Sequence, residues 1–134
     1  MQKQLKLERI FKHPAKKIWN AISKADEIGK WFLKADFKVE VGYNYTFTHE
    51  DTKIRGEVLE VDEPTKLVYT WEVEGSGVAS TVTWMLEEKG DETELIIEHI
   101  SEGDADENPA INPMFMEFQK DWENVYNELE KYLK

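Results

Sequence analysis

His99 is the side chain of this sequence best suited to moving a proton, because imidazole changes its protonation state near neutral pH. His99 continues the alternation of Leu95 and Ile97, so in an extended strand these three side chains share one face, and Glu94 and Glu98 share the other. The apolar face is the one to be buried, and His99 is therefore expected to point into the interior. Three polar side chains on the inward faces of other expected strands would accompany it: Tyr45, Tyr69 and Ser80.

This histidine has two chemical interpretations. As a general acid or base in a cyclase, dehydratase or hydrolase, it would have to lie within hydrogen-bond reach of the reacting group. As a structural group, it would form a hydrogen bond to a tyrosine or to the backbone, as buried polar groups usually do. The sequence supplies no second catalytic group for His99, so we predict a non-enzymatic protein without catalytic residues.

Other catalytic and metal chemistries lack the residues that they need. There is no cysteine, and no Gly-x-Ser-x-Gly turn supplies an activated serine. No pair of histidines has a metal-ligand spacing such as His-Glu-x-x-His. The acidic residues 104–108 begin like a calcium loop, but Pro109 occupies the place of the turn glycine and Phe115 that of the final glutamate. We therefore predict neither a metal site nor a cofactor.

Most of the sequence between Gly42 and Ser101 alternates apolar and polar residues with the period of a β-strand. Short turns separate the alternating segments, and such turns allow only antiparallel neighbours. The alternation slips at Val58 and Leu59, which indicates a bulge. The expected strands, including one that precedes this region, contain residues 5–11, 42–47, 54–61, 67–73, 78–86 and 93–99.

Three helices are expected around these strands. Pro14 suits a first helical turn, and the spacing of Ile18 and Ile22 predicts a short helix, followed by a second over residues 26–31. Residues 102–113 are acidic and contain two prolines, which is typical of a loop. The last helix is long, and its apolar residues recur every three or four positions, so that they form one stripe. The stripe consists of Phe115, Phe118, Trp122, Val125, Leu129, Tyr132 and Leu133.

An amphipathic helix that follows a run of strands must bury its stripe against the sheet. The expected fold class is therefore α+β: a curved antiparallel sheet of six to seven strands wrapped around a long C-terminal helix, with two short helices after the first strand. The length of 134 residues fits one domain that spans residues 1–134.

The charge of the chain is unevenly distributed. Residues 1–38 carry ten Lys or Arg and four Asp or Glu, a net charge of +6, whereas residues 39–134 carry seven and twenty-four, a net charge of −17. The acidic excess disfavours nucleic acid, while the basic first part offers a contact for an anionic partner. The first residues lack the apolar core of a signal peptide, and no apolar run approaches the roughly 20 residues that cross a bilayer. We expect a cytoplasmic protein with no stable membrane association.

Segments from nearly the whole chain resemble, in order, those of a known family. The most specific stretch combines Gly56-Glu57-Val58-Leu59-Glu60-Val61 with Leu67-Val68-Tyr69-Thr70-Trp71. The other matching segments are Arg9 to Ser23, Ile28 to Phe32, Val82 to Leu86, Thr93 to His99 and Trp122 to Leu133. Together they resemble the SRPBCC superfamily, which includes the START domains and the birch pollen allergen, and within it the branch of homologues of the activator of heat shock protein 90 ATPase.

The resemblance implies a START-like helix-grip fold, in which the sheet wraps around the last helix. It also implies binding of a small hydrophobic ligand, aromatic or lipid-like, in a cavity between sheet and helix. A second possibility is a protein-interaction module that contacts a chaperone or another protein. The superfamily also contains cyclases, so a cyclase or hydrolase is a third alternative, although fold alone does not define function.

The alternation of the strands and the spacing of the helix indicate which side chains would line such a cavity. Ligand pockets are mostly apolar, with a few polar groups that orient the guest. Aromatic side chains at these spacings also form ordinary cores, so the same residues have a packing interpretation. The residues expected to frame the site are Trp31, Phe32, Tyr45, Phe47, Tyr69, Trp71, Trp84, His99, Phe118 and Trp122.

Overall fold

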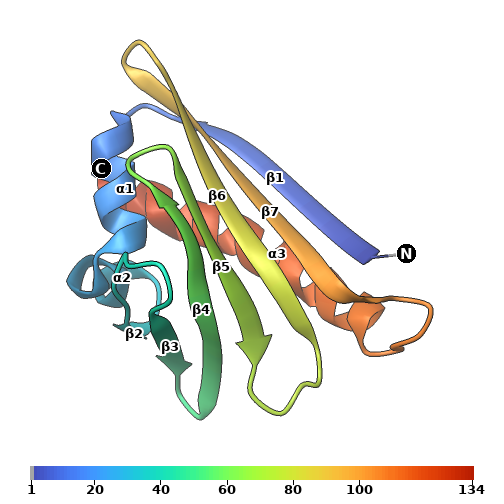
Figure 1. Cartoon of the computed structure of the whole chain (residues 1–134). Helices are drawn as coiled ribbons and strands as arrows, with labels where there is room; N and C mark the ends of the chain where they lie inside the picture. The colour runs from blue at the N-terminus through green and yellow to red at the C-terminus, as the bar shows by residue number, and fades with distance from the viewer. Residues whose placement is uncertain (1) are drawn as a thin grey trace.

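A computed structural model describes residues 2–134 and contains seven strands and three helices in that part of the chain (Figure 1). The strands are β1 (Gln2–Phe11), β2 (Lys34–Asp36), β3 (Asn44–His49), β4 (Thr52–Asp62), β5 (Lys66–Val73), β6 (Ala79–Lys89) and β7 (Glu92–Asp104). The helices are α1 (Ala15–Ser23), α2 (Ala25–Trp31) and α3 (Ile111–Leu133).

The strands form one antiparallel sheet in the order β1-β7-β6-β5-β4-β3-β2. Every neighbouring pair except β1 and β7 is consecutive among the strands of the chain, as short turns require. The first strand forms one edge of the sheet by pairing with the last strand, with Phe11 opposite Thr93. The predicted fold class is confirmed: a curved antiparallel sheet, two short helices after the first strand, and a long helix at the end.

The long helix α3 crosses one face of the sheet, while in the part of the chain that the structure describes no helix covers the other face (Figure 1). The Tyr126 hydroxyl donates to the carbonyl oxygens of Leu7 and Leu95 at 2.9 and 3.0 Å, which ties the helix to β1 and β7. The Lys17 ammonium of α1 donates to the Leu133 carbonyl at 2.8 Å, a favourable contact for a helix C-terminus. The buried residues of α3 form one stripe: Ile111, Phe115, Phe118, Trp122, Val125, Tyr126, Leu129 and Leu133.

The predicted loop over residues 102–113 is wrong at both ends. Strand β7 continues to Asp104, and α3 begins at Ile111 with Pro113 inside its first turn. The first N–H groups of a helix have no intrahelical partner, so a proline costs little there.

Two further differences lie near β3. Strand β2 was not predicted, because its three residues are too few to show an alternation. Strand β3 begins at Asn44 and not at Gly42, whose φ of +91° belongs to a turn. The predicted bulge in β4 is confirmed, because the pairing with β5 shifts register between Val58 and Glu60.

Candidate functional site

The ten residues predicted to frame the site all belong to the core between the sheet and the helices or pack against it. Eight of them are buried: Tyr45, Phe47, Tyr69, Trp71, Trp84, His99, Phe118 and Trp122. Trp31 and Phe32 are partly buried at the end of α2. The structure therefore brings the predicted residues together into one aromatic cluster beneath α3.

His99 lies at the centre of this cluster and has no exposed surface. Trp122 of α3 donates from Nε1 to His99 Nδ1 at 2.9 Å, so Nδ1 acts as the acceptor and the proton of the neutral ring resides on Nε2. Nε2 lies 2.6 Å from Ser80 Oγ, to which it donates, and Ser80 in turn donates to the Trp71 carbonyl at 3.1 Å. The ring of Phe118 stacks on the imidazole with 4.4 Å between centroids.

Burial lowers the pKa of His99 from 6.5 to about 3, because the interior disfavours the charged imidazolium. The ring is therefore neutral at physiological pH, in agreement with the tautomer that its two hydrogen bonds define. Both nitrogens are occupied by protein partners. A general base needs a nitrogen within reach of the reacting group, and His99 offers none in this arrangement.

Trp71 carries the one polar atom of the cluster that lacks a partner. Its side chain is 5% exposed, and Nε1 has no hydrogen-bond partner among the described residues. The indole lies against Trp122, with 5.2 Å between centroids, and against Phe47, His99 and Phe118 at longer separations. An indole N–H in such surroundings is a hydrogen-bond donor that is ready for an acceptor.

The two buried tyrosines differ in how their hydroxyls are used. Tyr45 donates to the Thr70 carbonyl at 2.6 Å, whereas Tyr69 accepts from Trp84 Nε1 at 2.7 Å. Burial raises the pKa of both hydroxyls above the ordinary value of 10, so both remain protonated. Tyr69 thus keeps its own proton, and its ring stacks beside that of Trp71.

Trp31 and Phe32 form the exposed edge of the cluster. Trp31 donates from Nε1 to the Ala21 carbonyl at 2.8 Å and stacks between Phe32 and Tyr132. Phe32 continues inward to Phe47 and Trp122 with centroid separations of 5.7 and 6.2 Å. A continuous path of aromatic rings therefore leads from the surface to the centre of the cluster.

Three aromatic members of the cluster were not predicted. Phe37 is buried against Tyr45, Phe47 and Tyr69, but it lies in a stretch without periodicity that would have indicated its direction. Phe115 lies 5.0 Å from His99 between ring centroids, and the sequence places it only in the helix stripe. Tyr132 stacks on Trp31 with 6.4 Å between centroids, and the sequence places it only in the helix stripe.

The part of the chain that the structure describes holds no group of three His, Cys, Asp or Glu side chains placed to bind a metal ion. Among the described residues, no helix is long and apolar enough to cross a membrane.

The sequence matches a family model over residues 12–134, nearly all of the chain, and the description of that family is "Activator of Hsp90 ATPase homolog 1-like protein". The chain belongs to this family. The match confirms the resemblance to the heat shock protein 90 ATPase activator branch, and the family's fold supports a ligand-binding or co-chaperone-like module. A comparison with curated proteins finds no match.

Solved structures share the fold. Protein MLL2253 from Mesorhizobium loti is 26% identical, with a TM-score of 0.88 over 98% of this chain and 96% of that protein. CalU16 from Micromonospora echinospora is 22% identical, with a TM-score of 0.81 over 99% of this chain and 77% of its own. An HSP90 activator from Plasmodium falciparum is 22% identical, with a TM-score of 0.63 over 72% and 71% of the two chains.

Proposed function

We propose that this chain binds a small hydrophobic molecule, aromatic or lipid-like, between the sheet and α3. The observation that carries the proposal is the unpaired Nε1 of Trp71, which lies among aromatic rings. A buried donor without an acceptor costs about 1–3 kcal/mol. A ligand oxygen that accepts this hydrogen would recover that free energy, so the preferred guest is apolar and carries a carbonyl, ether or hydroxyl oxygen.

The ligand would enter beside Trp31 and Phe32, the partly exposed edge of the cluster. Because the rings between this edge and Trp71 touch one another, the guest has to replace ring–ring contacts with ring–ligand contacts. The transfer of its apolar surface from water favours binding by about 25 cal/mol per Å². Movement of α2 away from α3 would make room, because Phe32 at the end of α2 packs against Trp122 of α3.

A matched pair of probes tests both parts of the proposal. The acetyl and ethyl derivatives of naphthalene have similar size, but only the acetyl compound carries an acceptor oxygen. Titration of each into the chain, followed by tryptophan fluorescence and amide NMR shifts, is expected to perturb residues of both the sheet and α3. The acetyl compound is expected to bind more tightly, on the order of tenfold, because it satisfies the Trp71 donor.

The variant Trp71→Phe removes the indole N–H and keeps an aromatic ring. It is expected to abolish the preference for the acetyl compound while it still binds the ethyl compound. The control is Trp84→Phe, since Trp84 Nε1 already donates to Tyr69 and its loss leaves the preference unchanged. If neither compound perturbs residues from both sheet and helix, ligand binding at this site is excluded.

A second candidate is a co-chaperone function, which two observations favour. The family is described by its likeness to an Hsp90 ATPase activator, and one neighbour of the same fold is an HSP90 activator. The chain also separates its charges, with +6 on residues 1–38. Exposed lysines place part of this charge on α1 (Lys16), on α2 (Lys30) and between the two helices (Lys24).

The test is the ATP hydrolysis rate of purified Hsp90 with and without the chain, at low and at high salt. A co-chaperone of this kind would raise the rate at low salt and lose the effect with Lys24→Glu and Lys30→Glu, but not with Lys131→Glu on α3. An unchanged hydrolysis rate at low salt excludes this function.

A further inference from the structure

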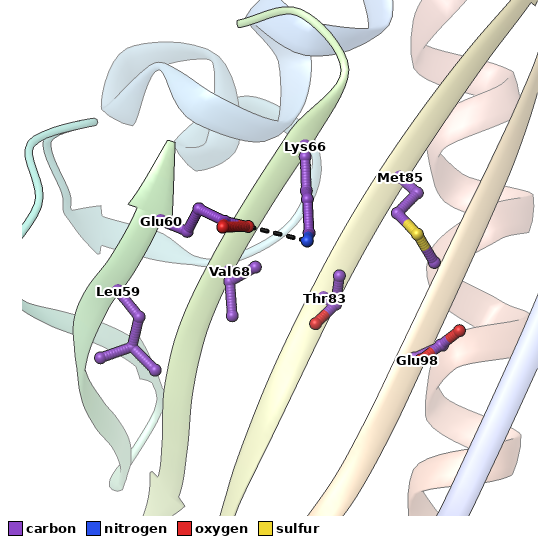
Figure 2. Close-up of a pocket in the computed structure, with 7 residues that line it drawn as sticks. All are labelled: Leu59, Glu60, Lys66, Val68, Thr83, Met85 and Glu98. Carbon is purple, nitrogen blue, oxygen red and sulfur yellow. Dashed lines mark ion pairs between the residues drawn. The ribbon is translucent and has the colours of Figure 1, made fainter. Parts of the chain in front are cut away.

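The face of the sheet turned away from α3 carries a hollow of about 420 Å³ across β4, β5, β6 and β7 (Figure 2). Its floor consists of the side chains of Val68 and Thr83, which are cross-strand partners. Figure 2 shows them pointing out of the sheet between larger neighbours. The hollow is separate from the aromatic cluster, because its lining side chains lie on the face of the sheet turned away from α3.

The floor lies between two carboxylates. Glu60 pairs with Val68, Val68 with Thr83, and Thr83 with Glu98, so these four residues form one row across four strands. Three strand spacings separate the ends of the row, which places Glu60 and Glu98 about 14 Å apart. Small side chains thus occupy the centre of the row and acidic side chains its two ends.

Apolar walls stand on either side of the row. Leu59 is the extra residue of the β4 bulge, and it is 44% exposed on this face. Met85 flanks the floor on the other side, next to Lys66 on the neighbouring strand. A bulge that turns a leucine towards water leaves apolar surface that a partner can cover.

The charge of the hollow is negative. Lys66 lies 2.8 Å from Glu60, and its pKa is raised first by the hydrogen bond and the charge of Glu60 and then by Asp62 and Glu98. Among the lining residues, the two carboxylates of Glu60 and Glu98 outnumber the one ammonium of Lys66. Glu98 has no ion pair within the described residues, because its cross-strand neighbour Lys6 is 3.5 Å from Glu8 instead.

We propose that this hollow docks an extended basic segment of a partner protein, with an apolar side chain at its centre and cationic side chains two positions before and after it. In an extended chain, side chains i and i+4 lie on the same side and about 14 Å apart, which matches the span from Glu60 to Glu98. The central side chain covers Val68 and Thr83 between the apolar walls. The cation at the Glu98 end meets an unpaired carboxylate.

The probe is a capped peptide with the sequence Arg-Ser-Leu-Ser-Arg, titrated into the full chain and followed by amide NMR. The expected shifts map to Val68, Thr83 and Glu98 and leave α3 unchanged, and the affinity falls as salt is added. Two control peptides carry glutamate in place of arginine, or serine in place of leucine. Both are expected to bind at least threefold more weakly, because they lose the charge complementarity or the apolar contact.

Variants of the chain complete the test. Glu98→Gln is expected to weaken the arginine peptide about two- to fivefold, as removal of an exposed charge pair does. Glu94→Gln is the matched control, since it lies on the same strand and face but outside the hollow. Leu59→Ser changes an exposed wall and should weaken binding without unfolding the chain. The proposal is overturned if the peptide does not bind at millimolar concentration, if its shifts map elsewhere, or if Glu98→Gln and Glu94→Gln behave alike.

Discussion

The stability of this fold should depend on pH through His99. The folded ring is neutral with a pKa of about 3, whereas the unfolded histidine titrates at 6.5. Between these two values the unfolded chain binds a proton that the folded chain does not. The free energy of unfolding therefore decreases as the pH falls below 6.5, and above 6.5 His99 has no effect on it.

The size of the effect follows from the two pKa values. At about pH 5.5 the unfolded state gains about 1.4 kcal/mol from protonation of His99, and at about pH 4.5 it gains about 2.7 kcal/mol. Many carboxylates also begin to titrate at the lower value, so the cleanest comparison runs from about pH 7.5 to about pH 5.5.

The variant His99→Asn isolates this contribution. An asparagine oxygen can accept the hydrogen bond from Trp122 Nε1 in place of Nδ1, while the side chain no longer titrates. Urea unfolding curves for both proteins, followed by tryptophan fluorescence, measure the free energy of unfolding at each pH. The variant is expected to be less stable at about pH 7.5, because Ser80 loses the hydrogen bond from His99 Nε2, but only the slope of stability with pH decides the question.

The parent chain is expected to lose about 1.4 kcal/mol more than His99→Asn over this pH range. All other titrating groups, His13 included, are common to the two proteins, so their contributions to the pH dependence of stability cancel. Parallel pH profiles would refute the reasoning, since they would mean that the folded ring binds protons as easily as the unfolded one.

The remaining predictions concern single contacts, and each is measured by chemical unfolding. Gly56→Ala is expected to destabilise the fold by more than about 2 kcal/mol, because its Cβ would overlap a carbonyl of β5, whereas Gly29→Ala in α2 meets nothing and should stabilise by up to about 1 kcal/mol. Equal effects of the two substitutions on stability would contradict the overlap expected at Gly56. Tyr126→Phe should cost about 1–2 kcal/mol, because its hydroxyl bonds carbonyls on β1 and β7; a neutral result would show that these bonds do not hold α3. Arg55→Ala should change stability by less than about 1 kcal/mol, since its ion pair with Glu74 is exposed, and a larger loss would be inconsistent with this exposure.

The direction of the core side chains was predictable from sequence. Trp71, Trp84 and His99 face α3, because alternation along a strand assigns each side chain to one of two faces. Phe118 and Trp122 belong to the stripe that helical spacing defines. These patterns are local, so they can be recognised without knowledge of the rest of the fold.

The contacts among these side chains were not predictable. The bond from Trp122 Nε1 to His99 depends on how far α3 is shifted along the sheet, and no periodicity records that shift. Phe37 enters the cluster from a stretch whose direction is set by β2 pairing with β3. Alternation assigns each side chain to one face of the sheet but does not give the distances between rings. In the structure the rings of the cluster lie 4.4–6.4 Å apart between centroids.

The pairing of β1 with β7 limits the order in which the strands can pair while the protein is being synthesised. Among the described residues, five other strands separate β1 along the chain from β7, its neighbour in the sheet. Until β7 has been synthesised, β1 has no strand to pair with, and long-range pairing of this kind folds slowly. Strand β1 can pair only after β7 leaves the exit tunnel, and α3, which covers the aromatic face of the sheet, follows β7 in the chain.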